Sequence, residues 1–365
     1  MRIFIDAMCA EYGGIRTYVE QLLGRWHEQY PEDEVHVALR AGSTIQTPGL
    51  HRHEYPVGRP DVLARPWAQA TAMHRDIART RPDVVLATAP TTTPRRPKAP
   101  LAVVILDLRA ELRPEQFSRA RRALRWASYG RSYALASGFI SISQRSLDDL
   151  HRLHPATASL PGVVVYLGAD HVAQWPAPTR DGRAIAFAHH TNKNPDLVVR
   201  GWKVLADRGV RIPLTFLGVS RDLRDELSSL IDSLELADLV ELAPFLPDDQ
   251  FQATLSAARM IVFPSDFEGF GLPIVEGMAL GKPVVIGLDP GCVEVAGGHA
   301  FDLGAWTPEA LADQVQRADP MSAEQTEAAR AWAATFQWSS TVTRTRDALS
   351  ALLEKVSATS RSLTG

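Results

Sequence analysis

Short apolar runs alternate with amphipathic stretches along the whole chain. The short runs have the length of buried strands, and the longer stretches repeat apolar positions with the period of a helix. The predicted strands lie at residues 2–6, 35–39, 84–88, 102–106, 138–142, 183–188, 213–217, 239–242, 260–263 and 284–287. The predicted helices lie at residues 15–26, 195–208, 222–234, 247–258, 272–280, 308–317, 322–336 and 340–355. This alternation predicts an α/β protein with parallel sheets covered by helices on both faces and ligands beyond the carboxyl ends of the strands.

Two series of strands and helices follow one another. The stretch between them, ADHVAQWPAPTRDG at residues 169–182, is rich in proline, glycine and polar residues, which predicts a hinge. A chain of 365 residues is long enough for two domains of ordinary size. We therefore expect α/β domains at residues 1–168 and 183–337, a last helix at 338–356 and a disordered tail at 357–365.

The most specific stretch is VFPSDFEGFGLPIVEGMALGKPVVIG at residues 262–287. A strand, a glycine-rich turn and a helix start bring unpaired N–H groups and a positive helix end to one place. Glu268 lies in the turn and Glu276 eight positions further on, where about 100° of rotation per residue lets both face one cleft. Carboxylates only accept hydrogen bonds, so they suit the vicinal diol of a ribose or pyranose. Either glutamate alone could be a solvated helix residue or a cap, but the combined motif favours a ligand site.

This motif resembles the E-x7-E motif of the retaining glycosyltransferases of family four, which have the GT-B fold. The resemblance implies two Rossmann-like, doubly wound domains facing a cleft, with the last helix crossing back to the first domain and Trp338 as its anchor. It also implies that Glu268 contacts hydroxyls of the donor sugar and that Glu276 binds the ribose of the nucleotide. The backbone amides expected around the sugar and diphosphate are those of Gly269, Phe270, Gly271 and Leu272.

A second part of the motif set follows the first predicted strand of the second domain, in the sequence HHTNKNPD. The resembled family has an arginine and a lysine here, which neutralise the nucleotide diphosphate. Lys193 matches the lysine. The arginine is missing, with Asn192 adjacent and His189 and His190 nearby. A cation beside a departing diphosphate stabilises the transition state more than the ground state, so its loss predicts slower transfer unless another group compensates.

The first domain offers weaker signals. Gly13 and Gly14 precede the helix that follows the first strand, and in the resembled family this glycine loop lies near the donor phosphates and the acceptor. The family has His-Asp-Leu after a later strand, with the histidine on the donor sugar. This chain has Leu106 in that place, so the contact is lost or supplied elsewhere. Asp107 is retained, and it either orients an acceptor hydroxyl or caps the following turn.

Charge is distributed unevenly along the chain. Residues 1–170 contain 22 Lys+Arg against 17 Asp+Glu, and the remaining residues contain 17 against 25. Part of the basic excess is the tract FSRARRALRWASYGRSY at residues 117–133, where arginines recur at helical spacing beside Trp126. A solvated helix face is one interpretation, and a contact with an anionic membrane or acceptor is the other. Nucleic-acid binding is not expected, because the chain is acidic overall and has no known motif for it.

The composition narrows the setting. No apolar run reaches the roughly 20 residues that span a bilayer, and the chain opens without a signal peptide, so we expect a cytoplasmic protein, with any membrane contact peripheral to the inner face. Cys9 and Cys292 are too few for a disulfide framework or a cysteine metal site. No metal site is expected at His189 and His190 either, since no carboxylate or cysteine stands at ligand spacing.

The resemblance implies a metal-independent hexosyltransferase that moves a sugar from a nucleotide diphosphate donor to an acceptor hydroxyl with retention of configuration. No cofactor is expected. We expect a UDP- or GDP-linked donor, with Phe245 flanking the base, and an acceptor that is a glycan, a glycolipid or a small natural product. Two alternatives stay open: a sugar-nucleotide-binding protein without catalysis, and a sugar-nucleotide epimerase on the same fold. A dinucleotide dehydrogenase is disfavoured, because no G-x-G-x-x-G follows the first strand.

Overall fold

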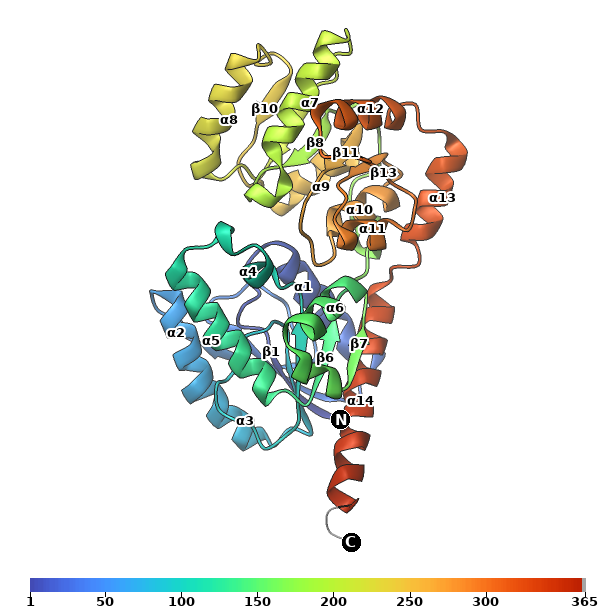
Figure 1. Ribbon diagram of the computed structural model, residues 1–365. Helices are drawn as coiled ribbons and strands as arrows, with labels where there is room; N and C mark the ends of the chain where they lie inside the picture. The colour runs from blue at the N-terminus through green and yellow to red at the C-terminus, as the bar shows by residue number, and fades with distance from the viewer. Residues whose placement is uncertain (363–365) are drawn as a thin grey trace. The chain divides into compact units, whose positions relative to one another are not determined.

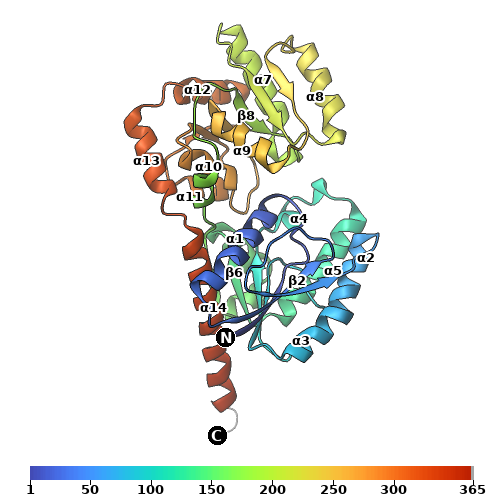
Figure 2. The same ribbon diagram turned by 180° about the vertical axis from the view of Figure 1, so that it is seen from behind.

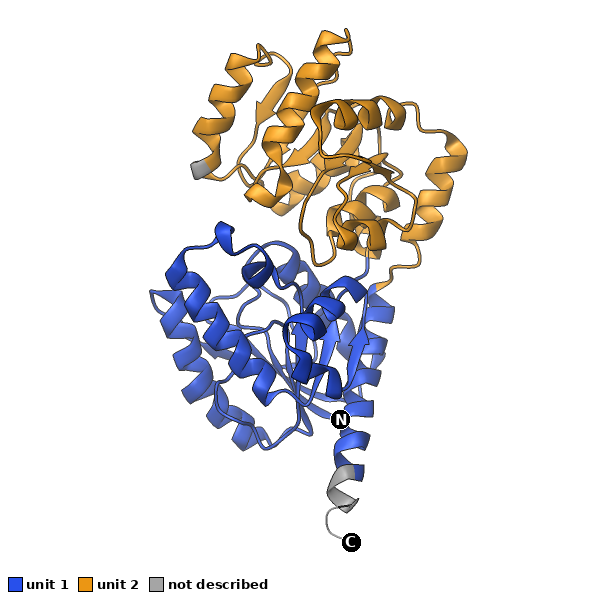
Figure 3. Cartoon of the chain, in the orientation of Figure 1, with its two compact units in different colours: residues 1–168, 338–365 blue, residues 169–337 orange. Residues whose placement is uncertain are grey.

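The computed structural model describes residues 1–362, apart from the side chains of Asp222 and of residues 359–362. The chain divides into two compact units, coloured separately in Figure 3. Unit 1 contains residues 1–168 together with the segment that begins at Trp338, and unit 2 contains residues 169–337. Among the described residues, no helix is both long enough and apolar enough to cross a membrane.

Unit 1 is built on a seven-stranded sheet with the order β3-β2-β1-β4-β5-β6-β7, and its recorded pairings are all parallel. Its strands are β1 (Arg2–Asp6), β2 (Glu34–Arg40), β3 (His51–Tyr55), β4 (Val84–Ala87), β5 (Leu101–Ile105), β6 (Gly138–Ser141) and β7 (Gly162–Val164). Five of the seven follow the predicted apolar runs. The two strands at the sheet edges, β3 and β7, were not predicted.

Helices cover both faces of this sheet. They are α1 (Gly13–Gln29), α2 (Asp61–Ala68), the π-helix η1 (Gln69–Met73), α3 (His74–Thr80), α4 (Arg109–Leu112), α5 (Arg119–Leu135), α6 (Gln144–Leu153) and α14 (Trp338–Ser362). Figure 1 shows α5 and α6 in front of the sheet, where Phe4 of β1 belongs to the same buried cluster as Tyr133 and Leu147. Figure 2 shows α1 on the opposite face, the side toward which Ile3 and Ile5 alternate.

The last helix, α14, completes the core of unit 1. Trp338 is fully buried, and its ring lies 6.5 Å from that of Tyr18 on α1. Arg346 forms an ion pair with Asp33 at 2.8 Å, and its guanidinium lies 4.3 Å from the ring centre of Tyr30. The helix continues to Ser362, so it includes residues 357–362 of the stretch that we expected to be a disordered tail. Residues 363–365 lie outside the described residues.

Unit 2 contains a six-stranded parallel sheet with the order β10-β9-β8-β11-β12-β13. Its strands are β8 (Ala184–Phe187), β9 (Leu214–Leu217), β10 (Val240–Leu242), β11 (Met260–Phe263), β12 (Val284–Ile286) and β13 (Phe301–Asp302). Its α-helices are α7 (Pro195–Asp207), α8 (Arg221–Ser233), α9 (Asp248–Ala257), α10 (Leu272–Ala279), α11 (Pro290–Ala296), α12 (Pro308–Ala318) and α13 (Ala323–Ala333). Every predicted strand and helix of this unit is present, with ends shifted by a few residues.

Both faces of the second sheet are buried, as a doubly wound fold requires. Along β8, Ala184 and Ala186 belong to a core cluster with α7, α8 and α12, whereas Ile185 and Phe187 belong to a cluster with α9, α10 and α13. Residues 169–182, where we predicted a hinge, form part of unit 2. This segment is tied to the unit because Val172 is buried in the second cluster.

Candidate functional site

The candidate site lies at the carboxyl ends of β8 and β11 in unit 2. The chain runs from β8 outward through β9 and β10, then returns to add β11 on the other side of β8. Strand order therefore reverses between β8 and β11, and open α/β sheets bind ligands at such a switch point. The loop after β8 carries Lys193 at the end of a short 3-10 helix, Thr191–Lys193, and the loop after β11 carries Glu268.

Glu268 and three neighbours form the Glu268 cluster, defined here as Glu268, Lys193, Asn192 and Ser265. The Oε1 atom of Glu268 accepts hydrogen bonds from Asn192 Nδ2 at 3.2 Å and from Ser265 Oγ at 2.5 Å, and it forms an ion pair with Lys193 Nζ. Both charged side chains are largely buried, and the ammonium lies 4.2 Å from the ring centre of Phe263. A buried carboxylate needs such partners, because removing a charge from water without them is costly.

Hydrogen bonds to backbone carbonyls hold the two loops of the cluster together. Asn192 Nδ2 donates to the carbonyl of Phe267 at 2.9 Å, and the amide of Asp266 donates to the carbonyl of Asn192 at 3.0 Å. Asn194, with φ of 49°, donates from Nδ2 to the carbonyl of Pro264 at 2.9 Å and precedes the first residue of α7. The cluster is therefore a preformed arrangement of both loops.

Asp289 supports the cluster from the next strand end. Its Oδ2 atom accepts from the amide of Glu268 at 3.1 Å and from the amide of Gly291 at 3.0 Å, so it caps α11 while it holds the glycine-rich turn. A Cβ on Gly291 would lie 2.6 Å from the carbonyl oxygen of Glu268, so only glycine allows this approach. Asp289 was not predicted from the sequence, although an aspartate before Pro290 is a helix-start signal that could have identified it.

The glycine-rich turn ends at the N-terminus of α10. Gly271 has φ of 87°, and a Cβ there would lie 3.0 Å from Ile274, so this position requires glycine. The four residues whose amides we expected to surround a donor, Gly269, Phe270, Gly271 and Leu272, span this turn and the first helical position. The first N–H groups of a helix have no partner within the helix, and the helix dipole favours negative charge beside them. The turn and the N-terminus of α10 together therefore have the chemistry of an anion-binding site.

Glu276 has a different partner from Glu268. Its side chain is buried within α10, with 5% of the residue exposed, and His171 Nε2 donates to its Oε1 at 3.1 Å. The ring of His171 in turn packs edge-on against Trp175 at 5.4 Å. His171 comes from the segment that we predicted as a hinge, and the sequence around it gave no signal of this role.

An exposed aromatic surface lies beside the Glu268 cluster, where β8, β9 and β10 end. Phe245 is 68% exposed, and its ring centre is 6.4 Å from that of His189. Gly218, which follows β9, separates them: a Cβ there would lie 3.4 Å from Phe245 and 3.6 Å from His189. An aromatic side chain so exposed at a strand-end site suits a stacked planar ligand.

The remaining predicted residues lie in unit 1. Gly13 has φ of 65° and opens α1, with Gly14 as the next residue, and both are exposed. Asp107 follows β5, and its Oδ1 accepts from the amide of Arg109 at 2.9 Å. This contact caps the turn before α4, which is one of the two roles left open for Asp107.

Two doubly wound units, with the last helix returned to the first, define the GT-B fold of glycosyltransferases. The crystal structure of HepE from Anabaena in complex with UDP and glucose aligns with a TM-score of 0.72 over 96% of this chain and 100% of that one, at 19% identity. That of WaaG, a glycosyltransferase involved in lipopolysaccharide biosynthesis, aligns with a TM-score of 0.71 over 96% and 99%, at 14% identity. At such identities the likeness shows the fold alone.

Sequence relatives of the chain are also glycosyltransferases and related synthases. D-inositol 3-phosphate glycosyltransferase of Mycolicibacterium paratuberculosis is 31% identical over 220 residues, which cover 54% of this chain and 48% of that protein. Mannosylfructose-phosphate synthase of Agrobacterium fabrum is 31% identical over 130 residues, which cover 33% and 29%. The chain thus spans about half or less of the length of these relatives. Residues 183–330 match the family model described as glycosyl transferases group 1, and this segment belongs to that family.

Proposed function

We propose that the protein is a retaining glycosyltransferase that moves a hexose from a nucleotide diphosphate donor to an acceptor hydroxyl without a metal ion. The observation that carries the proposal is the Glu268 cluster, because it places a buried carboxylate and a cation at the switch point beside a helix N-terminus. The comparisons support the same function, because one relative is named as a glycosyltransferase and HepE was crystallised with UDP and glucose.

Each part of the cluster has a role in this reaction. Glu268 accepts hydrogen bonds from hydroxyls of the donor sugar and so fixes the anomeric carbon. Lys193 and the N-terminus of α10 offset the negative charge that grows on the diphosphate as the glycosidic bond breaks. A lysine has three N–H donors, and the contacts of the described residues use one of them on Glu268, which leaves donors for phosphate oxygens. His189 and Phe245 flank the base, which is uracil or guanine.

Retention follows if the acceptor attacks the face from which the diphosphate leaves. A donor phosphate oxygen then takes the acceptor proton, and no side chain has to act as a base. Asp107 agrees with this mechanism, because its carboxylate caps a turn.

A thermal-shift screen of the full chain against UDP, GDP, ADP, TDP and their sugars tests the donor site. A nucleotide at a hundred times its dissociation constant adds roughly 2.7 kcal/mol of stability, which a raised melting midpoint reveals. We expect a uracil or guanine nucleotide to raise the midpoint. If no nucleotide does so, the proposed donor site is wrong.

Turnover separates the proposal from its two alternatives. A transferase releases the nucleoside diphosphate from its donor faster when an acceptor is present. An epimerase converts the donor alone and releases no diphosphate. A protein that binds the nucleotide without catalysis shifts the melting midpoint but gives no product with any acceptor, and the missing arginine and Leu106 would then account for the loss.

The Glu276→Gln variant should bind the nucleotide at least about tenfold more weakly. Glutamine can still accept the hydrogen bond from His171, so the ligand-free protein should keep its melting midpoint. It presents only one acceptor oxygen, however, and cannot hold both hydroxyls of a ribose. Isothermal titration with the nucleotide identified in the screen measures the change. Unchanged affinity would show that Glu276 only anchors residues 169–182 to α10.

We further propose that α5 of unit 1 binds the protein to an anionic lipid surface. Trp126 is 73% exposed, and Arg119, Arg122 and Arg125 have no acidic partner among the recorded ion pairs of the described residues. With Tyr129 these residues line a cavity of about 540 Å³. A basic helix with an exposed tryptophan is typical of peripheral membrane contact, and it fits a glycolipid acceptor better than a free polyol.

The Arg122→Glu variant should therefore partition about tenfold or more weakly onto vesicles that contain phosphatidylglycerol. Each basic residue near an anionic surface contributes about 1 kcal/mol, and reversal of the charge removes more than that. Vesicle sedimentation measures the partition coefficient. The matched control is Arg75→Glu, which reverses an exposed charge on α3 of the same unit. Equal loss in both variants would reduce the effect to net charge alone.

A further inference from the structure

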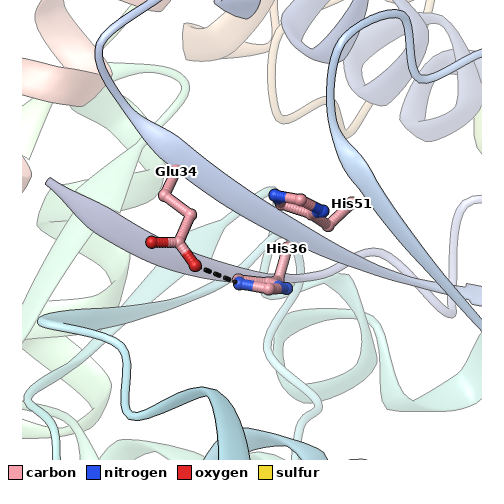
Figure 4. A group of neighbouring side chains, drawn as sticks. All are labelled: Glu34, His36 and His51. Carbon is pink, nitrogen blue, oxygen red and sulfur yellow. Dashed lines mark hydrogen bonds and ion pairs between the residues drawn. The ribbon is translucent and has the colours of Figure 1, made fainter.

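Three potential metal ligands converge at one edge of the unit 1 sheet, in a group that the proposed transfer does not use. Glu34 and His36 lie on β2, two positions apart and therefore on one face of the strand. His51 lies on the neighbouring edge strand β3, directly opposite His36 in the parallel register. Figure 4 shows the three side chains close together, with the contact between Glu34 and His36 dashed. We call Glu34, His36 and His51 the His36 cluster.

The side chains of the His36 cluster are already in contact. His36 Nε2 lies 3.0 Å from Glu34 Oε1, and the rings of His36 and His51 are stacked with centres 4.7 Å apart. One ligand atom from each of the three residues can be chosen so that all three lie within 4.8 Å of one another. His36 is buried, Glu34 is half-buried and His51 is exposed, so the group opens to solvent on the side of His51.

We propose that the His36 cluster binds one divalent transition-metal ion, of which Zn²⁺ is the best match, through two imidazole nitrogens and one carboxylate oxygen. This ligand set suits zinc, nickel and copper, whereas calcium and magnesium prefer oxygen ligands alone. A protein that supplies three ligands leaves a fourth tetrahedral position for water.

The geometry requires only a small adjustment. With metal–ligand bonds of about 2.0–2.1 Å, tetrahedral ligand atoms lie about 3.3 Å apart. The ligand atoms of the His36 cluster, within 4.8 Å of one another, must therefore approach by about 1.5 Å at most. Rotation of the exposed His51 ring and of the Glu34 side chain supplies that movement, while the buried His36 stays in place.

Outer partners hold the ligands in orientations that favour a metal. The second oxygen of Glu34 is paired with Arg2 Nε at 2.7 Å, which fixes the plane of the carboxylate. His36 Nδ1 lies 3.0 Å from His53 Nε2. A proton on His36 Nδ1, donated to His53, leaves the lone pair of His36 Nε2 for the ion. Such hydrogen bonds from the second ring nitrogen are the usual support of metal-bound histidines.

The ion would join the edge strand to the rest of the sheet. The recorded pairing of β3 is with β2 alone, and its sequence HRHEY contains few apolar residues to bury. A metal bound by His51 of β3 and by two residues of β2 would add a cross-link between these strands. The proposed ion is thus structural, and it takes no part in sugar transfer, so this proposal stands whether or not the proposed function is correct.

Zinc binding to the full-length chain tests the proposal. The protein is prepared without a histidine tag, stripped with EDTA and dialysed, and isothermal titration with zinc chloride then gives stoichiometry and affinity. We expect one ion per chain, at least tenfold weaker binding in His51→Ala and in Glu34→Gln, and unchanged binding in His27→Ala, which removes an exposed histidine of α1. Magnesium chloride should give no saturable heat.

A second readout locates the ion. Zinc should slow hydrogen exchange of the β3 amides in the wild type and not in His51→Ala, whose fold is checked by its melting midpoint in EDTA. Two results would overturn the proposal: absence of saturable zinc binding by the wild type in the micromolar range, or equal affinity in His51→Ala and His27→Ala. In the second case the ion sits on other histidines, such as His189 and His190.

Discussion

Replacing Glu268 by glutamine is expected to slow sugar transfer by at least about a hundredfold. Removal of one preorganised polar group from other active sites lowers the rate by a similar factor. Glutamine keeps the size of the side chain and an acceptor for Asn192 and Ser265. It removes the negative charge that pairs with Lys193, and its amide cannot accept from two sugar hydroxyls as a carboxylate does. The lysine, freed from its ion pair, should hold the nucleotide at least as tightly as before.

The measurement is release of nucleoside diphosphate from the donor found in the screen, with affinity for the free nucleotide determined in parallel. We expect kcat to fall while nucleotide affinity is kept. Glu309→Gln is the matched control, because it makes the same change on an exposed position of α12. Full activity in Glu268→Gln would remove Glu268 from the mechanism.

Replacing Lys282 by methionine is expected to lower the free energy of unfolding by about 2–3 kcal/mol. Lys282 is only 1% exposed, and its Nζ donates to the backbone carbonyls of Thr179 and Ser256. Methionine fills a similar volume but donates nothing, so the carbonyl of Thr179 loses its hydrogen bond inside unit 2. Urea denaturation measures the change. Lys203→Met, at a half-exposed position of α7, should stay within about 0.5 kcal/mol of the wild type.

The same comparison has a defined pH dependence. Burial lowers the pKa of Lys282 to about 8, from the 10.5 that is usual for a lysine in water. Between these two values the unfolded chain binds more protons than the folded chain, so stability rises with pH. The stability of the wild type relative to Lys282→Met should therefore increase as the pH is raised from about 8 toward 10. A difference that stays flat across this range would show that the buried amine keeps its proton.

The apolar pattern predicted the parts of the fold that are buried on both sides. All of the predicted strands are present, and all but the edge strand β10 are central strands, which a parallel sheet buries on both faces. The pattern could not predict β3, whose sequence HRHEY has the polarity of a loop and lies at an edge of the sheet. It also missed the segment from α2 to α3, where Pro66 and the π-helix η1 interrupt the helical period.

The residues of the candidate site could be predicted from the sequence, but the contacts between them could not. The motif around Glu268 and the loop of Lys193 each carried a signal, but their ion pair joins residues 75 positions apart and depends on the pairing of β8 with β11. The contact of Glu276 with His171 could not be predicted either, because these residues lie 105 positions apart in the chain. The His36 cluster could not be recognised at all, because it exists only once β3 is placed beside β2.

The division of the chain also sets the order in which it can fold during synthesis. Unit 2 is one continuous segment, whereas the core of unit 1 needs Trp338 and the helix that begins there, which the ribosome makes only after the whole of unit 2. At about 5–20 residues per second, the intervening chain takes on the order of 10–30 s to emerge. During that time the first 168 residues expose the apolar surface that α14 later covers, and this is the period in which a nascent chain depends most on chaperones.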